Sequence, residues 1–228
     1  MDGTRKVITG IVESTRKEGR YVVAVDGRPA HTVSLDIIDQ LKLCVGGAVD
    51  AAGEAALEGA AAALQTYDRA LNLLAFQARS ARDLRRKLVQ KGEPAEHVER
   101  AIERLTAQGL LDDAQFARQL ARSKVASQGA SRRRLQQEMF KRGVAREVAD
   151  EAIAEVYEDE QVDEGVLVEE VARKKVRSLA KLDPEARRRR LYAFLARRGY
   201  EGEAIRRAMR AVLDAEEGRE AADAIDGE

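Results

Sequence analysis

The chain has 228 residues, of which 44% are hydrophobic, 35% are charged and only 4% are aromatic, with no tryptophan. A core drawn from small aliphatic side chains beside so much charge is typical of thin, solvated helices rather than of a compact globule. The single cysteine excludes an internal disulfide, and no apolar run is long enough to span a membrane. We therefore expect a mainly α, cytoplasmic and monomeric protein.

The charges cancel overall, at 40 basic and 40 acidic side chains, but they are segregated along the chain. Residues 118–142 carry eight basic side chains against one acid, and residues 173–210 carry fourteen against four. Residues 150–170 carry ten acids and no base, and residues 214–228 carry seven acids and one arginine. Blocks of one sign act on partners locally, so the net charge does not exclude an anionic partner.

The first 35 residues differ from the rest of the chain. Runs rich in β-branched residues at 7–13 and 21–25 favour strands, and Asp26-Gly27 stands where a tight hairpin turn would precede a third run at 28–35. A short helix is expected at 36–43. From about residue 54 the pattern becomes helical and stays so, which predicts a small β element before a helical region.

The helical region contains three copies of one unit, from about residue 67 to residue 213. Five positions recur at an offset of 51 residues and then at a further offset of 56. The three sets are Leu84, Leu88, Gly92, Ile102 and Leu105; Leu135, Met139, Gly143, Ile153 and Val156; and Leu191, Leu195, Gly199, Met209 and Val212. The larger second offset places five extra residues between Leu167 and Arg187, in a longer helix or loop.

These patterns divide the chain into five parts. They are an N-terminal β-hairpin and short helix at 1–50, a linker helix with the first three-helix repeat at 51–111, a second repeat at 112–161, a third at 162–213 and an acidic tail at 214–228. The predicted fold is three tandem three-helix repeats forming an elongated curved array. Such arrays present extended surfaces to partners, so the repeats favour a binding protein.

Residues suited to catalysis are few. His31 and His97 have no nucleophile or acid placed around them, and Cys44, which follows an apolar helix, is expected to be a buried thiol. Metal and nucleotide motifs are absent, and the acids at 158–160 are consecutive, unlike a calcium loop. The sequence therefore predicts no enzyme, no cofactor and no metal.

Two basic positions recur in all three copies. Lys91, Arg142 and Arg198 precede the glycine that ends the second helix, where a cation stabilises the helix dipole without any partner. Arg82, Arg133 and Arg189 fall in the predicted first turn of that helix, where a cation is unfavourable. Helix stability does not explain this second set, so these arginines are candidates for binding the phosphates of a nucleic acid. The alternative is a charged face that contacts only solvent.

Other arginines crowd the same helices. The candidate DNA or filament contacts are Arg79, Arg82, Arg85, Arg86, Arg132, Arg133, Arg134, Arg142, Arg188, Arg189 and Arg198. Because few aromatic residues accompany them, we expect binding to single-stranded DNA to be weak, electrostatic and independent of sequence.

Three motifs together resemble one family. They are residues 73–80 (LLAFQARS), residues 83–92 (DLRRKLVQKG) and residues 109–117 (GLLDDAQFA). In this combined spacing the chain resembles the RecX regulatory proteins, modulators of the RecA recombinase, over about residues 66–213. The resemblance implies binding to the RecA–single-stranded-DNA filament and inhibition of its ATPase, strand exchange and co-protease activities, within homologous recombination, DNA repair and the SOS response.

The chain departs from the family pattern at two places. Glu93 follows the first repeat glycine, where an apolar or aromatic residue such as Val144 or Tyr200 is usual, and residues 127–131 (SQGAS) replace a glycine-rich basic turn. Two other functions stay open, a helix-turn-helix-like DNA-binding regulator and a helical-repeat protein scaffold. The sequence does not distinguish capping of filament ends from blocking along the groove, nor does it identify the RecA-contacting residues or the role of the tail.

Overall fold

The computed structural model describes the backbone of residues 5–226 and the side chains of residues 5–215. The chain divides into two compact units. The first holds residues up to 79 together with 83–111, and the second holds residues 80–82 together with those from 112 onward.

The first unit begins with an antiparallel sheet in the order β3-β2-β1-β4, built from β1 (Lys6–Glu13), β2 (Tyr21–Val25), β3 (Arg28–Val33) and β4 (Ala48–Val49). The turn predicted at Asp26-Gly27 is confirmed, because both residues have positive φ, at 49° and 79°. The short helix α1 (Leu35–Gln40) follows β3. The fourth strand was not predicted, since two residues that pair with the start of β1 leave no local pattern.

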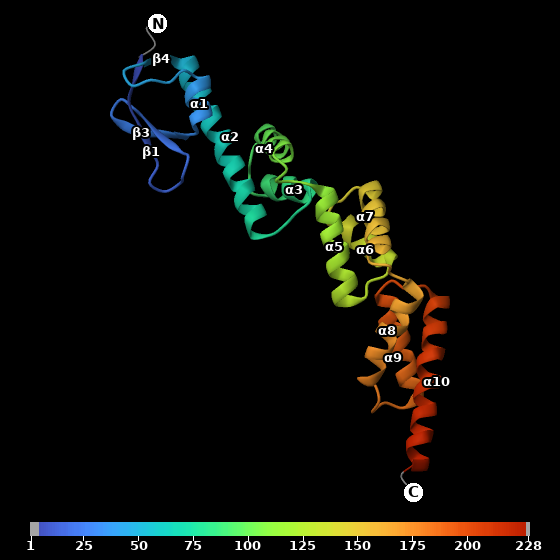
Figure 1. Cartoon of the computed structure of the whole chain (residues 1–228). Helices are drawn as coiled ribbons and strands as arrows, with labels where there is room; N and C mark the ends of the chain where they lie inside the picture. Colours follow the sequence, from blue (N-terminus) through green and yellow to red (C-terminus); the bar gives the residue numbers. More distant parts are fainter. Residues whose placement is uncertain (1–4, 227–228) are drawn as a thin grey trace. The chain divides into compact units, whose positions relative to one another are not determined.

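The sheet packs against the long helix α2 (Ala51–Phe76) (Figure 1). Ile8, Val23, Val33 and Val49 form a buried cluster that Leu57 of α2 completes. Further along α2, Asp68 forms ion pairs with Lys17 at 2.8 Å and Arg20 at 2.6 Å. The linker helix is therefore continuous with the first repeat and also carries the β element.

Each predicted repeat consists of three helices, as expected (Figure 1). The first comprises the C-terminal half of α2, α3 (Ala81–Gln90) and α4 (Ala95–Ala107), and the second comprises α5 (Asp113–Gln128), α6 (Arg132–Lys141) and α7 (Arg146–Asp159). The third comprises α8 (Glu164–Arg177), α9 (Pro184–Arg197) and α10 (Gly202–Asp226). The recurring leucines and Met139 on α3, α6 and α9 are fully buried, so the periodic positions are the core of each repeat.

The five extra residues of the third repeat lie where the offsets predicted them. The register places Arg188 opposite Arg132, the first residue of α6, yet α9 begins four residues earlier at Pro184. Asp183 caps this added turn by accepting a hydrogen bond from the Ala186 amide at 2.8 Å. The connection before α9 is three residues longer than the one before α6, and α8 ends two residues earlier than α5 does in the same register, which together account for the fifth residue.

The predicted acidic tail continues α10 as far as Asp226. Its last two residues and the side chains beyond residue 215 lie outside the described part of the chain.

Candidate nucleic-acid interface

The three repeat-equivalent arginines on the second helices share one property. Arg82, Arg133 and Arg189 are all exposed, and among the described side chains none of the three forms a hydrogen bond or an ion pair. Arg82 and Arg133 lie in the first helical turn, as predicted. For Arg189 the prediction was wrong, because the added turn of α9 places it one turn further in.

The arginines next to them are held by carboxylates of the same unit. Arg85 forms a bidentate ion pair with Glu99, with distances of 2.6 and 2.7 Å. Both Arg79 and Arg86 form ion pairs with Asp83. Burial raises the pKa of the Asp83 carboxyl, but the hydrogen bonds and charges of its two arginines outweigh burial and hold that pKa below its ordinary value.

On the second and third repeats the remaining candidates are also engaged. Arg134 pairs with Glu138 at 2.6 Å, and the guanidinium of Arg132 lies 3.9 Å from the centre of the Tyr157 ring. Arg188 is exposed but interacts within the chain. Among the candidates, the position of Arg82, Arg133 and Arg189 is thus the one at which all three repeats carry an exposed arginine without a partner among the described residues.

Arg142 and Arg198 serve a junction that occurs twice within the second unit. The Ser80 hydroxyl donates to the carbonyl oxygen of Arg142, and the Ser131 hydroxyl donates to that of Arg198 at 2.9 Å. Ser80 and Ser131 are repeat-equivalent, so each precedes a second helix and binds the end of the second helix in the next repeat. Both serines are fully buried, which explains why small hydroxyl residues occupy this position.

An acid completes each junction. Asp113, in the first turn of α5, accepts a hydrogen bond from the Ala81 amide at 2.7 Å. Glu164, in the first turn of α8, accepts one from the Arg132 amide at 3.3 Å. These free amides at a helix start favour a carboxylate. Matched polar contacts therefore occur twice within the second unit, and sequence reasoning did not identify them, although Ser80 and Ser131 recur at the offset of 51.

Comparison with known proteins identifies the family to which the three repeats belong. Models of the first, second and third three-helix domains of RecX match residues 67–105, 112–153 and 166–209. The chain belongs to the RecX family.

Two curated relatives carry the name regulatory protein RecX. The protein from Pelodictyon phaeoclathratiforme is 35% identical over 144 residues, which are 63% of this chain and 86% of the relative. That from Amycolatopsis mediterranei is 39% identical over 129 residues, or 57% of this chain and 72% of the relative.

Two crystal structures of RecX proteins share the fold. One, titled as the regulatory protein RecX, has a TM-score of 0.71 at 23% identity and covers 92% of this chain and 99% of its own. The other, RecX from Lactobacillus salivarius, has a TM-score of 0.55 at 17% identity and covers 66% of this chain and 96% of its own.

The departure from the RecX pattern at Glu93 has a structural reason. In the third repeat Leu167, Val171 and Tyr200 lie against Gly129 in the connection between α5 and α6. The equivalent residues of the first repeat are Gln65, Arg69 and Glu93, and Arg69 forms an ion pair with Glu93. The described chain before the first repeat folds as the β element and not as another repeat, so polar residues are expected at this end of the repeats.

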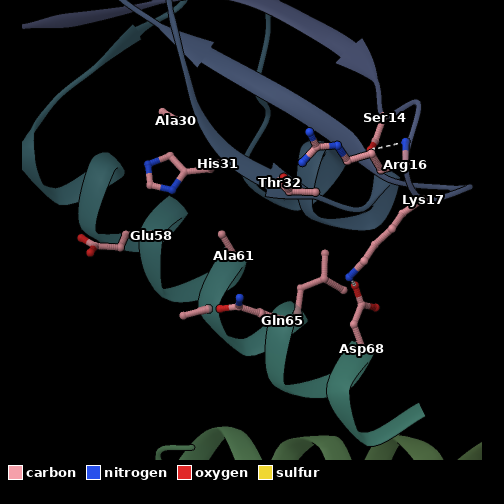
Figure 2. A pocket seen from close by; sticks show the side chains of 12 residues that line it. Ser14, Arg16, Lys17, Ala30, His31, Thr32, Glu58, Ala61, Gln65 and Asp68 are labelled. Atoms are coloured by element: carbon pink, nitrogen blue, oxygen red, sulfur yellow. Dashed lines mark hydrogen bonds and ion pairs between the residues drawn. The ribbon is translucent and has the colours of Figure 1, made fainter. Parts of the chain in front are cut away.

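A groove of the first unit does not match a phosphate site. It has a volume of about 550 Å³ and lies between β3 and α2, where Figure 2 shows His31 on one side and Glu58 and Gln65 on the other. Lys17 reaches across it to Asp68, so that cation is already neutralised (Figure 2). Because its charges are mixed, we assign no DNA contact to this groove.

Two of the expectations concern metal binding and the cysteine. Among the described residues no group of three or more histidine, cysteine or acidic side chains could hold a metal ion. The expectation of a buried Cys44 was wrong, because the thiol lies exposed in the connection between α1 and β4. Within the described part of the chain, no helix has both the length and the apolarity needed to cross a membrane.

Proposed function

We propose that this RecX-family chain is a non-enzymatic regulator that binds the RecA–single-stranded-DNA filament and inhibits the ATPase, strand exchange and co-protease activities of RecA. Membership of the RecX family supports RecA as the partner. The observation that carries the DNA contact is the exposed arginine at the same position of every repeat, Arg82, Arg133 and Arg189, for which the described residues provide no hydrogen bond or ion pair.

An unpaired arginine at the same position of each repeat fits a periodic anionic partner. Guanidinium groups bind phosphate oxygens without reading the base sequence, and binding releases counterions. Each contact is weak because the side chains are exposed. Three contacts on one chain still bind tightly together, because after the first is made the others form at a high effective concentration.

Exposed apolar side chains at the ends of two second helices suit the protein component of the filament. Val89 and Phe140 are repeat-equivalent, and they are 52% and 75% exposed. Each lies seven residues after an unpaired arginine, so both share a helix face with it. Single-stranded DNA cannot cover a valine favourably, and aromatic side chains of this kind are enriched in protein interfaces. We assign these residues to RecA.

The expected result for Phe140→Ser is weaker binding to the RecA filament, on the order of tenfold, with unchanged binding to free single-stranded DNA. Val166→Ser is the matched control, since Val166 is 57% exposed on α8 and belongs to no repeat-equivalent pair. Fluorescence anisotropy with RecA-coated and bare oligonucleotides measures both. Loss of binding to bare DNA, or equal behaviour of the two variants on the filament, would contradict the assignment to RecA.

The test of the function itself is the DNA-dependent ATPase of the RecA from the same organism, measured while this chain is titrated in. Inhibition that reaches a plateau near one chain per few RecA subunits is expected. A helix-turn-helix regulator would instead bind one duplex sequence tightly, and a scaffold would leave the ATPase unchanged.

A further inference from the structure

A groove of the second unit combines an aromatic ring with unpaired cations. It has a volume of about 380 Å³ and lies where the end of α5 meets α8 and α9. Its apolar part is formed by Leu167, Val171 and Phe194, and its cations are Lys174, Lys175 and Arg198. The three helices belong to the second unit, so the groove lies within one unit of the fold.

Phe194 is half-buried and faces two of these cations. The Lys175 ammonium lies 5.3 Å from the centre of its ring, and the Arg198 guanidinium lies 4.6 Å from it. The equivalent residues of the other repeats are Lys87 and Glu138, so the ring occurs in the third repeat alone. The groove is therefore not a by-product of repeat packing.

The cations of the groove lack partners of opposite charge. No carboxylate that the structure describes forms an ion pair with Lys174, Lys175 or Arg198, and Glu170 is the one acid among the lining residues. Burial lowers the pKa of the Arg198 guanidinium below its ordinary value. A cation that is partly desolvated without a counter-charge is unfavourable, and a bound anion would restore the balance.

We propose that this groove holds one nucleotide of single-stranded DNA, with its base against Phe194 and its phosphate near Lys174, Lys175 and Arg198. A nucleotide has a flat base that can stack on Phe194 and a phosphate that can pair with the cations. An acidic peptide side chain supplies only the negative charge. The inference rests on the proposed binding of single-stranded DNA and adds to it a contact that depends on the base.

The test compares two oligonucleotides of equal length, an oligodeoxythymidylate and an abasic strand with the same phosphates. Stacking of one base on an aromatic side chain contributes about 1–3 kcal/mol, so the full chain should bind the base-bearing strand on the order of tenfold more tightly. Phe194→Leu keeps an apolar side chain in the third-repeat core and should abolish this preference. Phe76→Leu is the matched control, since Phe76 is an exposed phenylalanine outside the groove, and it should preserve the preference.

The salt dependence separates the groove from the arginines of the second helices. Phe194→Leu should leave the slope of affinity against salt unchanged, whereas Lys174→Glu should make it shallower. Equal binding of both strands by the wild type, or a preference that survives Phe194→Leu in a variant with native circular dichroism, overturns the groove assignment and leaves the proposed function standing. Failure to bind either strand overturns the groove assignment and the proposed contact with single-stranded DNA, whereas regulation of RecA is tested by the ATPase titration. Tighter binding of an oligoglutamate peptide than of either strand would assign the groove to an acidic peptide instead.

Discussion

Replacing Arg82, Arg133 and Arg189 together by glutamate is expected to weaken binding to the RecA–DNA filament at least tenfold, because three phosphate contacts become repulsive at once. None of the three side chains has an ion pair to lose within the described structure, so the helices should persist. On single-stranded DNA each neutralised phosphate contributes about 0.7 to the slope of log affinity against log salt, so the slope should become shallower by about 2. Filament binding at several salt concentrations measures both quantities.

The matched control reverses three other exposed arginines, one on the third helix of each repeat. Arg100, Arg146 and Arg207 are 65%, 86% and 72% exposed and form helical ion pairs with Glu96, Asp150 and Glu203. Such pairs contribute only about 0.3–0.5 kcal/mol each, so this variant should also fold. It has the same net charge as the first. Equal weakening by the two variants would mean that overall charge, and not the repeat-equivalent position, determines binding.

The second large effect is expected from Gly199→Ala. Gly199 has a φ of 86°, and a Cβ atom there would lie 2.6 Å from the Ser131 hydroxyl and 2.9 Å from the backbone nitrogen of Arg134. The left-handed conformation costs a non-glycine residue about 1–2 kcal/mol, and overpacking adds about 1–3 kcal/mol. We expect the free energy of unfolding of the second unit to fall by about 2–5 kcal/mol, as measured by native-state hydrogen exchange.

Gly92→Ala is the internal comparison. Gly92 has nearly the same φ, 83°, but nothing lies within 4 Å of the position of an added Cβ atom. Only the conformational term applies, so the free energy of unfolding of the first unit should fall by about 1–2 kcal/mol. If both variants lose the same amount, the serine junction does not enclose Gly199 as tightly as the structure indicates.

The sequence predicted those parts of the fold that local patterns encode. Helical periodicity and the glycines at 92, 143 and 199 identified the repeats, and all three glycines adopt positive φ. The offset of 56 placed the insertion that became the added turn of α9. Strand β4 escaped prediction because its pairing with β1 is a contact between distant residues. Cys44 was misplaced because its exposure depends on the path of the chain between α1 and β4.

The candidate interface was predicted only in part, for a related reason. Repeat register showed that Arg82, Arg133 and Arg189 recur, but it could not exclude neighbours such as Arg85 from the candidate contacts. That exclusion depends on side-chain pairing, for example of Arg85 with Glu99 fourteen residues away on α4. The groove beside Phe194 is formed by three helices and has no sequence motif, so low aromatic content alone argued against any stacking contact.

The most direct measurement is the DNA-dependent ATPase of the RecA from the same organism, titrated with the wild type, the Arg82/Arg133/Arg189→Glu variant and the Arg100/Arg146/Arg207→Glu control. We expect the wild type and the control to inhibit at similar concentrations, and the first variant to require at least tenfold more protein. Absence of inhibition by the wild type would contradict the proposed function. Undiminished inhibition by the folded first variant would contradict the role of the three repeat-equivalent arginines.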